Sequence, residues 1–314
     1  MKQQRIARRV RRAGQTAALL TVGALLLAGC AKSAASPTAV SSAAAGLDTI
    51  EKGVVKVAIE PYMPYTDVKN GKMVGLDAEI LQEAAANLGL KVEFNVTDFK
   101  GMLGGVQSHR VDLTIGGVGW SKDRAAKGLF TDPVYYSPPA MAVVGDKTYN
   151  TIDDLLGKSI GTVTGYVWEK PIKEIPGATA KVYQDAATFF SDLGTGRIDV
   201  GFIDPLLVTY QAQQNPSTPF TLAYFTPPTD AQIAANPDYA DFRQIQIAFY
   251  VAKDAPTLEK ALAAQIDAMY ANGKLAAMVT KWGGDPNAFC KPAPYLQTVR
   301  SGVDRPAGWS LPTI

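Results

Sequence analysis

Residues 99–124 read FKGMLGGVQSHRVDLTIGGVGWSKDR, and this stretch decides the fold. It predicts a helix over 99–110 that leads directly into an apolar strand over 111–118. The strand ends among glycines, Gly117 and Gly119, and the chain then reaches Arg124. A helix followed by a buried strand is the unit of an α/β fold. Open backbone beside an arginine at the carboxyl end of such a strand predicts a ligand site there.

The same alternation of strand and helix runs through most of the chain. Patterns typical of strands and helices occur in an earlier and a later set: 53–59, 78–90 and 91–96, then 151–158, 159–163, 186–197 and 198–204. Strands that alternate with helices predict parallel sheets, and two such sets predict two lobes. A strand over 245–254 and a helix over 255–273 are expected to return to the first lobe.

The N-terminus has the pattern of an export signal. Basic residues precede an apolar run over 17–28 that is too short to span a bilayer. The run ends in Leu27-Ala28-Gly29-Cys30, which resembles the lipobox of bacterial lipoproteins and implies a lipid on Cys30. An ordinary secretory leader with an incidental cysteine is the alternative. Residues 1–29 are therefore expected to be a leader, and the Ala-, Ser- and Pro-rich residues 30–50 a flexible tether.

Charge and cysteine content exclude several classes of function. Without the six basic residues of the leader, 25 Lys and Arg face 29 Asp and Glu, a net charge of about −4. This balance does not favour nucleic acid as a partner. Cys290 has no expected disulfide partner if Cys30 carries lipid. Neither metal-ligand spacing nor a complete dinucleotide fingerprint occurs, so we expect no metal and no cofactor.

Several segments together resemble family 3 of the bacterial extracellular solute-binding proteins. They include GKMVGLDAEILQEAAANLGLKVEF (71–94), the opening stretch (99–124), GRIDVGFIDPLLVTY (196–210) and NGKLAAMVTKWGG (272–284). The resemblance implies a two-lobe periplasmic-binding-protein type II fold with two crossing hinge strands. Lobe 1 is then expected over 51–144 and 247–285, lobe 2 over 145–246, and a C-terminal extension without family counterpart, expected to pack on a lobe, over 286–314.

The same resemblance implies the function. The chain is expected to be the substrate-binding lipoprotein of an ABC importer, which captures a small solute, a polar amino acid, between its lobes. Its partners would be the membrane permease of the importer and, through the lipid, the membrane itself. The expected protein is a monomer, exported and anchored on the outer face of the cell membrane or in the periplasm.

The family clamps the ligand carboxylate with an arginine that matches Arg124. A guanidinium suits this task because it is always charged and matches a carboxylate with two parallel hydrogen bonds. The alternative is a solvated arginine paired with Asp123 or Asp132. Gly117 and Gly119 match positions where relatives present backbone carbonyls to the ligand ammonium, the alternative being tight packing of the strand end.

Asp204 matches the lobe 2 carboxylate that binds the ammonium in relatives. Because Pro205 follows, Asp204 could instead be a helix N-cap. Tyr62 and Phe99 fall where the family stacks two rings on the ligand side chain, although either could belong to the core. Trp120 is expected as a third wall.

One segment departs from the family pattern. Relatives commonly have small hydroxyl residues after a glycine at the start of a lobe 2 helix, whereas this chain has Gly165, Tyr166, Val167 and Trp168. Their backbone N–H groups could still bind a carboxylate. The missing hydroxyls count against an ordinary α-amino acid as the ligand.

Two other classes of function remain open. A dehydratase-like enzyme on the same scaffold would need a general acid or base, for which Glu60 and Asp204 are the candidates. His109 is expected to face solvent. A ligand-sensing receptor domain would usually continue into a transmembrane helix, which the C-terminal sequence does not resemble.

Overall fold

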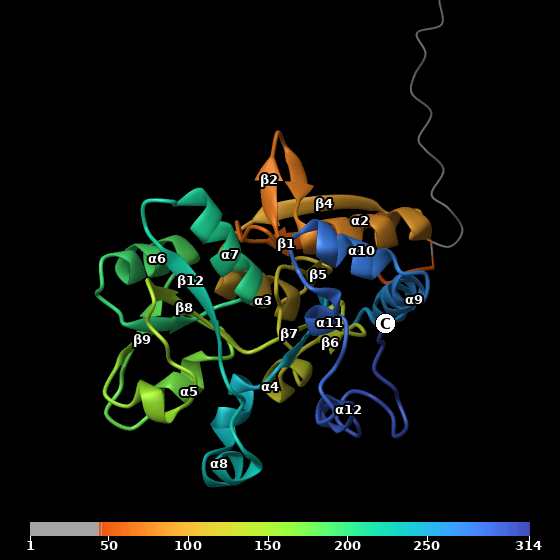
Figure 1. The fold of residues 1–314 in the computed structure, drawn as a ribbon. Helices are drawn as coiled ribbons and strands as arrows, with labels where there is room; N and C mark the ends of the chain where they lie inside the picture. Colours follow the sequence, from red (N-terminus) through yellow and green to blue (C-terminus); the bar gives the residue numbers. More distant parts are fainter. Residues whose placement is uncertain (1–43, 45) are drawn as a thin grey trace, which may run out of the picture. The chain divides into compact units, whose positions relative to one another are not determined.

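The computed structural model describes residue 44 and residues 46–314, and the leader, Cys30 and most of the predicted tether lie outside them. Two five-stranded sheets organise the described chain (Figure 1). The first contains, in spatial order, β4 (Lys91–Val96), β1 (Val54–Ile59), β5 (Leu113–Thr114), β14 (Tyr250–Val251) and β6 (Leu129–Phe130). The second contains β10 (Thr179–Tyr183), β9 (Ser159–Val163), β11 (Val200–Phe202), β8 (Ala140–Val144) and β12 (Phe220–Tyr224).

Each sheet carries its own helices, and we call the two resulting parts lobe 1 and lobe 2. Sheet 1 is packed by α2 (Leu76–Leu88), α3 (Phe99–Gln107) and α9 (Pro256–Ala271). Sheet 2 is packed by α5 (Glu169–Lys173), α6 (Ala186–Gly194) and α7 (Pro205–Gln214). The predicted two-lobe α/β architecture is confirmed.

Local sequence explains the elements that frame the site. The β-branched run of β1 is buried except at Lys56 and pairs in parallel with β4 and β5. Helix α2 ends at Gly89, which has the left-handed φ of 69° that favours glycine. Helix α3 begins at Asp98, whose carboxylate accepts a hydrogen bond from the Gly101 N–H.

The sheets are mixed rather than wholly parallel. Strand β14 runs antiparallel to β5 and β6, and β8 runs antiparallel to β11 and β12. Both strands lie where the chain passes from one sheet to the other without a helical crossover. Two consecutive strands of a sheet can run parallel only if such a crossover connects them, so these strands can run antiparallel. The prediction of parallel sheets therefore holds for the βα units alone.

Two short strands connect the lobes. β7 (Tyr135–Ser137) lies between β6 and β8 in the chain, and β13 (Ile245–Ile247) lies between β12 and β14. They pair with each other antiparallel, in the place expected for the two crossing strands. The single strand expected over 245–254 is thus divided between two sheets. β8 belongs to sheet 2, so the chain leaves lobe 1 before residue 140. The boundary expected after residue 144 is therefore placed too late in the chain.

The remaining elements are short. They are β2 (Asp67–Lys69), β3 (Lys72–Val74), α4 (Lys122–Ala125), α8 (Asp230–Ala235), α10 (Lys274–Lys281), α11 (Pro286–Phe289), α12 (Leu296–Val299) and the 3₁₀ helices η1 (Asp153–Leu155) and η2 (Pro237–Phe242). In the described part of the chain, no helix has the length and apolar character needed to cross a membrane.

The end of the predicted tether is held on lobe 1. Asp48 accepts a hydrogen bond from the Thr257 N–H, and its own N–H donates to the Thr257 hydroxyl. Thr257 lies in the first turn of α9, whose own N-cap residue makes no side-chain bond, so Asp48 supplies this cap from a distance. The predicted tether, expected to extend to residue 50, is therefore too long at its C-terminal end, since residue 48 is held on lobe 1.

Candidate ligand site

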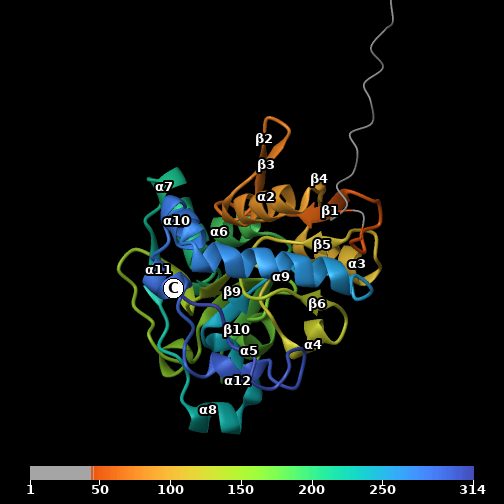
Figure 2. The same cartoon turned by 90° about the vertical axis from the view of Figure 1, so that its right-hand side faces the viewer.

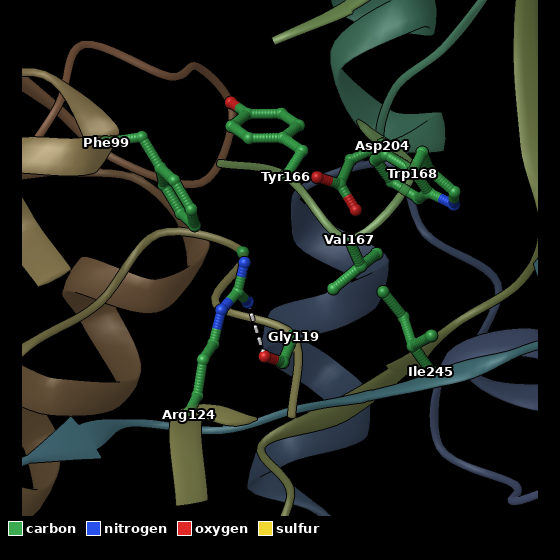
Figure 3. A pocket seen from close by; sticks show the side chains of 9 residues that line it. Phe99, Gly119, Arg124, Tyr166, Val167, Trp168, Asp204 and Ile245 are labelled. Carbon is green, nitrogen blue, oxygen red and sulfur yellow. Dashed lines mark hydrogen bonds between the residues drawn. The ribbon is translucent and has the colours of Figure 1, made fainter. Parts of the chain in front are cut away.

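A small cavity lies where the two lobes meet beside β13 (Figure 3). It is lined by Phe99, Gly117, Gly119, Arg124, Tyr166, Val167, Trp168, Asp204 and Ile245. The lobe 1 residues follow β4 and β5, and the lobe 2 residues follow β9 and β11. The site therefore lies at the carboxyl ends of strands from both sheets, as the sequence predicted.

Arg124 projects into the cavity from α4, with its side chain almost completely buried. Its Nη1 donates to the Gly119 carbonyl at 2.6 Å and its Nη2 to the Gly165 carbonyl of lobe 2 at 2.7 Å. The guanidinium also lies over the Phe99 ring, 5.2 Å from its centre. Burial lowers the pKa of Arg124 to about 10, so the side chain stays charged at neutral pH.

The alternative partners of Arg124 are engaged elsewhere. Asp123 pairs with Lys170 at 3.1 Å, and Asp132 pairs with Arg305 at 3.0 Å. Arg124 is thus a buried cation held by backbone carbonyls. The charge of Asp241 acts on it, but no ion pair joins Arg124 to a carboxylate of the described residues, so the guanidinium can bind an anionic group in the cavity.

Asp204 enters the cavity from the opposite side (Figure 3). It occupies the N-cap position of α7, yet its carboxylate makes no capping bond. Instead it accepts hydrogen bonds from the Tyr62 hydroxyl at 2.7 Å and the Ser137 hydroxyl at 3.1 Å. Burial raises the pKa of Asp204 to about 6, so the carboxylate is mostly ionised at neutral pH.

The glycines allow close approach of backbone and side chains. Gly117 has φ of 70°, and a Cβ added there would lie 3.3 Å from Asp204 Oδ2 and 3.4 Å from the Tyr62 ring. Its N–H donates to the buried carboxylate of Asp77, which fixes this turn. The carbonyl of Gly119, which we expected to face a ligand ammonium, instead accepts from Arg124.

Aromatic rings form part of the wall. Phe99 and Tyr166 line the cavity and meet edge to face with ring centres 4.8 Å apart. Tyr62, expected as a second wall, is buried and does not line the cavity; its ring meets Tyr166 edge to face at 5.9 Å. Trp120 does not line this cavity. Its ring lies on a separate groove beside Tyr295 and Leu296.

The segment 165–168, which departs from the family pattern, was expected to offer free backbone N–H groups to a ligand carboxylate. The Gly165 N–H donates to the Glu169 carboxylate and the Tyr166 N–H to the Val163 carbonyl. These two N–H groups already have partners within the chain. The segment contributes the Gly165 carbonyl and the side chains of Tyr166 and Val167 instead.

Glu60 lies behind the wall formed by Tyr166. Its carboxyl group is buried and accepts a hydrogen bond from the Tyr166 hydroxyl at 3.1 Å. Burial raises the pKa of Glu60 to about 8, with a contribution from the charge of Asp204. At neutral pH this arrangement favours a protonated Glu60 beside an ionised Asp204.

Two lining residues were missed by the sequence analysis. Trp168 belongs to the departing segment, but nothing in its spacing distinguishes it from a core residue. Ile245 lies 121 residues beyond Arg124 and reaches the cavity only because β13 crosses between the lobes.

The chain is similar in sequence to known proteins over most of the described residues. The sequence profile of the bacterial extracellular solute-binding proteins, family 3, matches residues 55–285. The L-cystine-binding protein TcyJ of Escherichia coli (strain K12) is 33% identical over 161 residues, which cover 50% of this chain and 60% of TcyJ. The arginine-binding extracellular protein ArtP of Bacillus subtilis (strain 168) is 25% identical over 82% of this chain and 96% of ArtP.

The fold of this chain is also similar to those of solved amino-acid-binding proteins. An ancestral arginine-binding protein bound to arginine matches with a TM-score of 0.64 and 26% identity, over 74% of this chain and 99% of that protein. The similarity therefore extends over both sheets and the strands that connect them.

Proposed function

Since the chain belongs to family 3 of the bacterial extracellular solute-binding proteins, we propose that it is the substrate-binding component of an ABC importer and captures an amino acid. One observation carries the proposal: a buried guanidinium and a buried carboxylate, Arg124 and Asp204, enter one small cavity from opposite lobes. A zwitterion has the complementary pair of charges.

The two charged groups divide the recognition between the lobes. Arg124 would bind the ligand carboxylate, since a charged acceptor makes a stronger hydrogen bond than a backbone carbonyl. Asp204 would bind the ammonium in place of, or together with, the Tyr62 hydroxyl. A ligand that contacts both lobes favours the arrangement in which both contacts are made.

Glu60, Phe99 and Tyr166 would recognise the side chain of the ligand. A polar or cationic side chain that reaches Tyr166 could take over the Tyr166 contact with Glu60 and stack on Phe99. The names of two relatives, which bind arginine and cystine, support a polar amino acid. We therefore propose a polar amino acid as the substrate class.

Binding requires the two lobes to separate. The cavity volume is only about 10 Å³, room for roughly one water molecule and too small for an amino acid. Hydrogen bonds also cross between the lobes, including those of Arg124 to Gly165, Tyr62 to Asp204 and Tyr166 to Glu60. These contacts must open before a ligand can enter.

A thermal-shift and calorimetry screen of the purified protein against amino acids tests the proposal. A ligand that binds the folded state raises the midpoint of unfolding by mass action. We expect stabilisation by at least one polar amino acid, and not by the corresponding amine without its carboxylate. A screen in which no amino acid binds would refute the function.

Localisation and partners belong to the same proposal. Export, a diacylglycerol on Cys30 and docking to the membrane permease are what the leader and the family imply for this chain. Cys30 lies outside the described residues, so the cavity supports only the binding step.

The enzyme alternative rests on Glu60 and Asp204, whose raised pKa values of about 8 and about 6 differ as those of a general acid and base do. We propose that the chain is a binding protein and not an enzyme, because both groups have the simpler role of holding ligand charges. Nuclear magnetic resonance of the bound amino acid distinguishes the two: a binding protein returns it unchanged after prolonged incubation.

A further inference from the structure

The C-terminal segment, residues 290–314, lies beyond the region matched by the family profile and is anchored on lobe 1 by a buried arginine. Arg300 is fully buried, and its Nη1 and Nη2 donate to the carbonyls of Thr131 and Phe130 at 2.9 and 3.1 Å. Its Nε and Nη2 donate to the carboxylate of Asp304 at 3.1 and 2.7 Å. The Trp309 ring covers the guanidinium at 5.2 Å. Arg300 therefore holds Asp304 in one orientation.

Asp304 connects this anchor to the loop that carries Arg124. Its Oδ2 accepts a hydrogen bond from Trp120 Nε1 at 3.1 Å. The backbone N–H of Trp120 donates to the Gln246 carbonyl of β13 at 2.8 Å, so the residue is fixed at both ends. Trp120 stands between Gly119, whose carbonyl holds the Arg124 guanidinium, and the residue that caps α4.

The same segment contacts both strands that connect the lobes. On β13, Gln246 Nε2 donates to the Leu296 carbonyl at 3.4 Å. On β7, the Tyr136 hydroxyl donates to the Pro312 carbonyl at 2.5 Å. Figure 2 shows α12 on the side of the molecule that faces the viewer, below the long helix α9. The C-terminal segment thus contacts lobe 1 and both strands, β7 and β13, that connect lobe 1 to lobe 2.

A second arginine makes the segment a part of the lobe 1 fold. Arg305 Nη2 pairs with Asp132 at 3.0 Å and with Glu259 of α9 at 2.8 Å. Burial raises the pKa of Glu259, and Arg305 opposes that rise. Removal of the whole segment would leave buried carboxylates without their cation, which is strongly destabilising. Point variants must therefore replace truncation as the test.

We propose that Asp304 is a positioning residue of the ligand site. Held by Arg300, it fixes Trp120 and thereby the Gly119 to Arg124 loop, so that the carbonyl of Gly119 holds the guanidinium at the angle the ligand needs. The inference rests on the proposed function, because it concerns the affinity of that same cavity. The indole of Trp120 binds Asp304 and so fixes the backbone on either side of it. The ring itself does not line the cavity.

The test uses Asp304→Asn, Trp120→Phe and the double variant of the full-length protein. Asp304→Asn keeps an acceptor but removes the charge, and Trp120→Phe keeps a ring but removes the N–H donor. Asp285→Asn and Trp282→Phe are the matched controls, since Asp285 caps α11 and the Trp282 Nε1 has no partner among the described residues. Affinity for L-arginine is measured by calorimetry, and exchange of the 117–125 amides is measured by mass spectrometry without ligand.

Each single variant should weaken L-arginine binding about tenfold, Trp120→Phe by loss of the N–H donor and Asp304→Asn by loss of the Arg300 ion pair that orients the acceptor. The double variant should bind no more weakly than Asp304→Asn, because the Trp120 bond depends on that orientation. Exchange over 117–125 should rise in the same variants, while both controls stay within twofold of wild type. Wild-type exchange and affinity in Asp304→Asn, or additive losses in the double variant, would overturn the proposal.

The failure of the proposed function is distinguishable from the failure of this inference. If wild-type protein binds no amino acid, the function fails, but the exchange measurement still tests the positioning of the loop. If Asp304→Asn does not fold, Trp120→Phe decides the matter, because it leaves the Arg300 to Asp304 pair intact.

Discussion

Glu60 should make the binding of a cationic amino acid depend on pH. Its carboxyl group is buried behind Tyr166, and burial raises its pKa to about 8. A ligand cation beside Glu60 favours the ionised form and lowers this pKa. Binding then releases a proton below pH 8, so affinity should fall as the pH is lowered.

The magnitude follows from the pKa. A carboxyl group with a pKa of about 8 is about 75% ionised at pH 8.5 and about 3% ionised at pH 6.5, a ratio of roughly 25. We therefore expect the Kd for L-arginine to be about 25-fold higher at pH 6.5 than at pH 8.5. Asp204, with a pKa of about 6, adds less than about twofold in this range. Arg124, with a pKa of about 10, stays charged throughout.

Calorimetry at four pH values between 6.5 and 8.5 measures this slope, with L-glutamine as the neutral ligand and Glu60→Gln as the matched variant. The side-chain amide introduced by Glu60→Gln could still accept from the Tyr166 hydroxyl but could not titrate. L-Glutamine should show a flat profile, and so should Glu60→Gln with either ligand. A change of less than threefold for L-arginine and wild-type protein would show that Glu60 does not face the ligand cation, and a slope that persists in the variant would assign it to another group.

Four further predictions address the rest of the proposal. Arg124→Ala should weaken amino-acid binding by about 30-fold to several thousand-fold, because loss of one partner of a buried charge pair costs about 2 to 5 kcal/mol; calorimetry that finds less than threefold would remove the carboxylate assignment. Asp204→Asn should cause a similar loss for amino acids but not for the matching acids without an amine, which competition assays can compare. Small-angle scattering should give a smaller radius of gyration with ligand than without, and an equal radius at saturation would contradict closure. Cys30→Ser should release the protein from the membrane fraction, whereas unchanged membrane association with an unchanged N-terminus would exclude lipidation.

The charged residues of the site were predictable because each follows the carboxyl end of a strand. Arg124 and Asp204 come shortly after β5 and β11, so the α/β topology and the family pattern bring them together. Glu60 directly follows β1 in the same way, but the sequence gives no measure of its burial, so only the structure shows its raised pKa.

Trp120 shows why neighbours of predicted residues can be misplaced. Gly119 forms an isolated bridge with Ile247, so the chain is extended there. Successive side chains of an extended chain point to opposite sides. With position 119 facing the cavity, the ring of Trp120 must face away from it, toward Asp304. The contacts of the C-terminal segment with Trp120 and Thr131 span 184 and 169 residues and involve residues beyond the region matched by the family profile, so no local pattern could predict them.

The contacts within the cavity also explain why a zwitterion, more than a neutral solute, should displace them. Arg124 is bound to the neutral carbonyl of Gly165, and Asp204 to the neutral hydroxyl of Tyr62. A ligand that only replaces these hydrogen bonds gains little, because the number of bonds stays the same. A carboxylate on Arg124 and an ammonium on Asp204 convert both into ion pairs, which add the attraction between opposite charges, and the guanidinium can bind a carboxylate through two parallel hydrogen bonds. Both replacements occur in a buried site, where charge pairs are screened less than at the surface. The selectivity of the site should therefore come from this exchange of partners, and a ligand that lacks either charge should lose the advantage at that end.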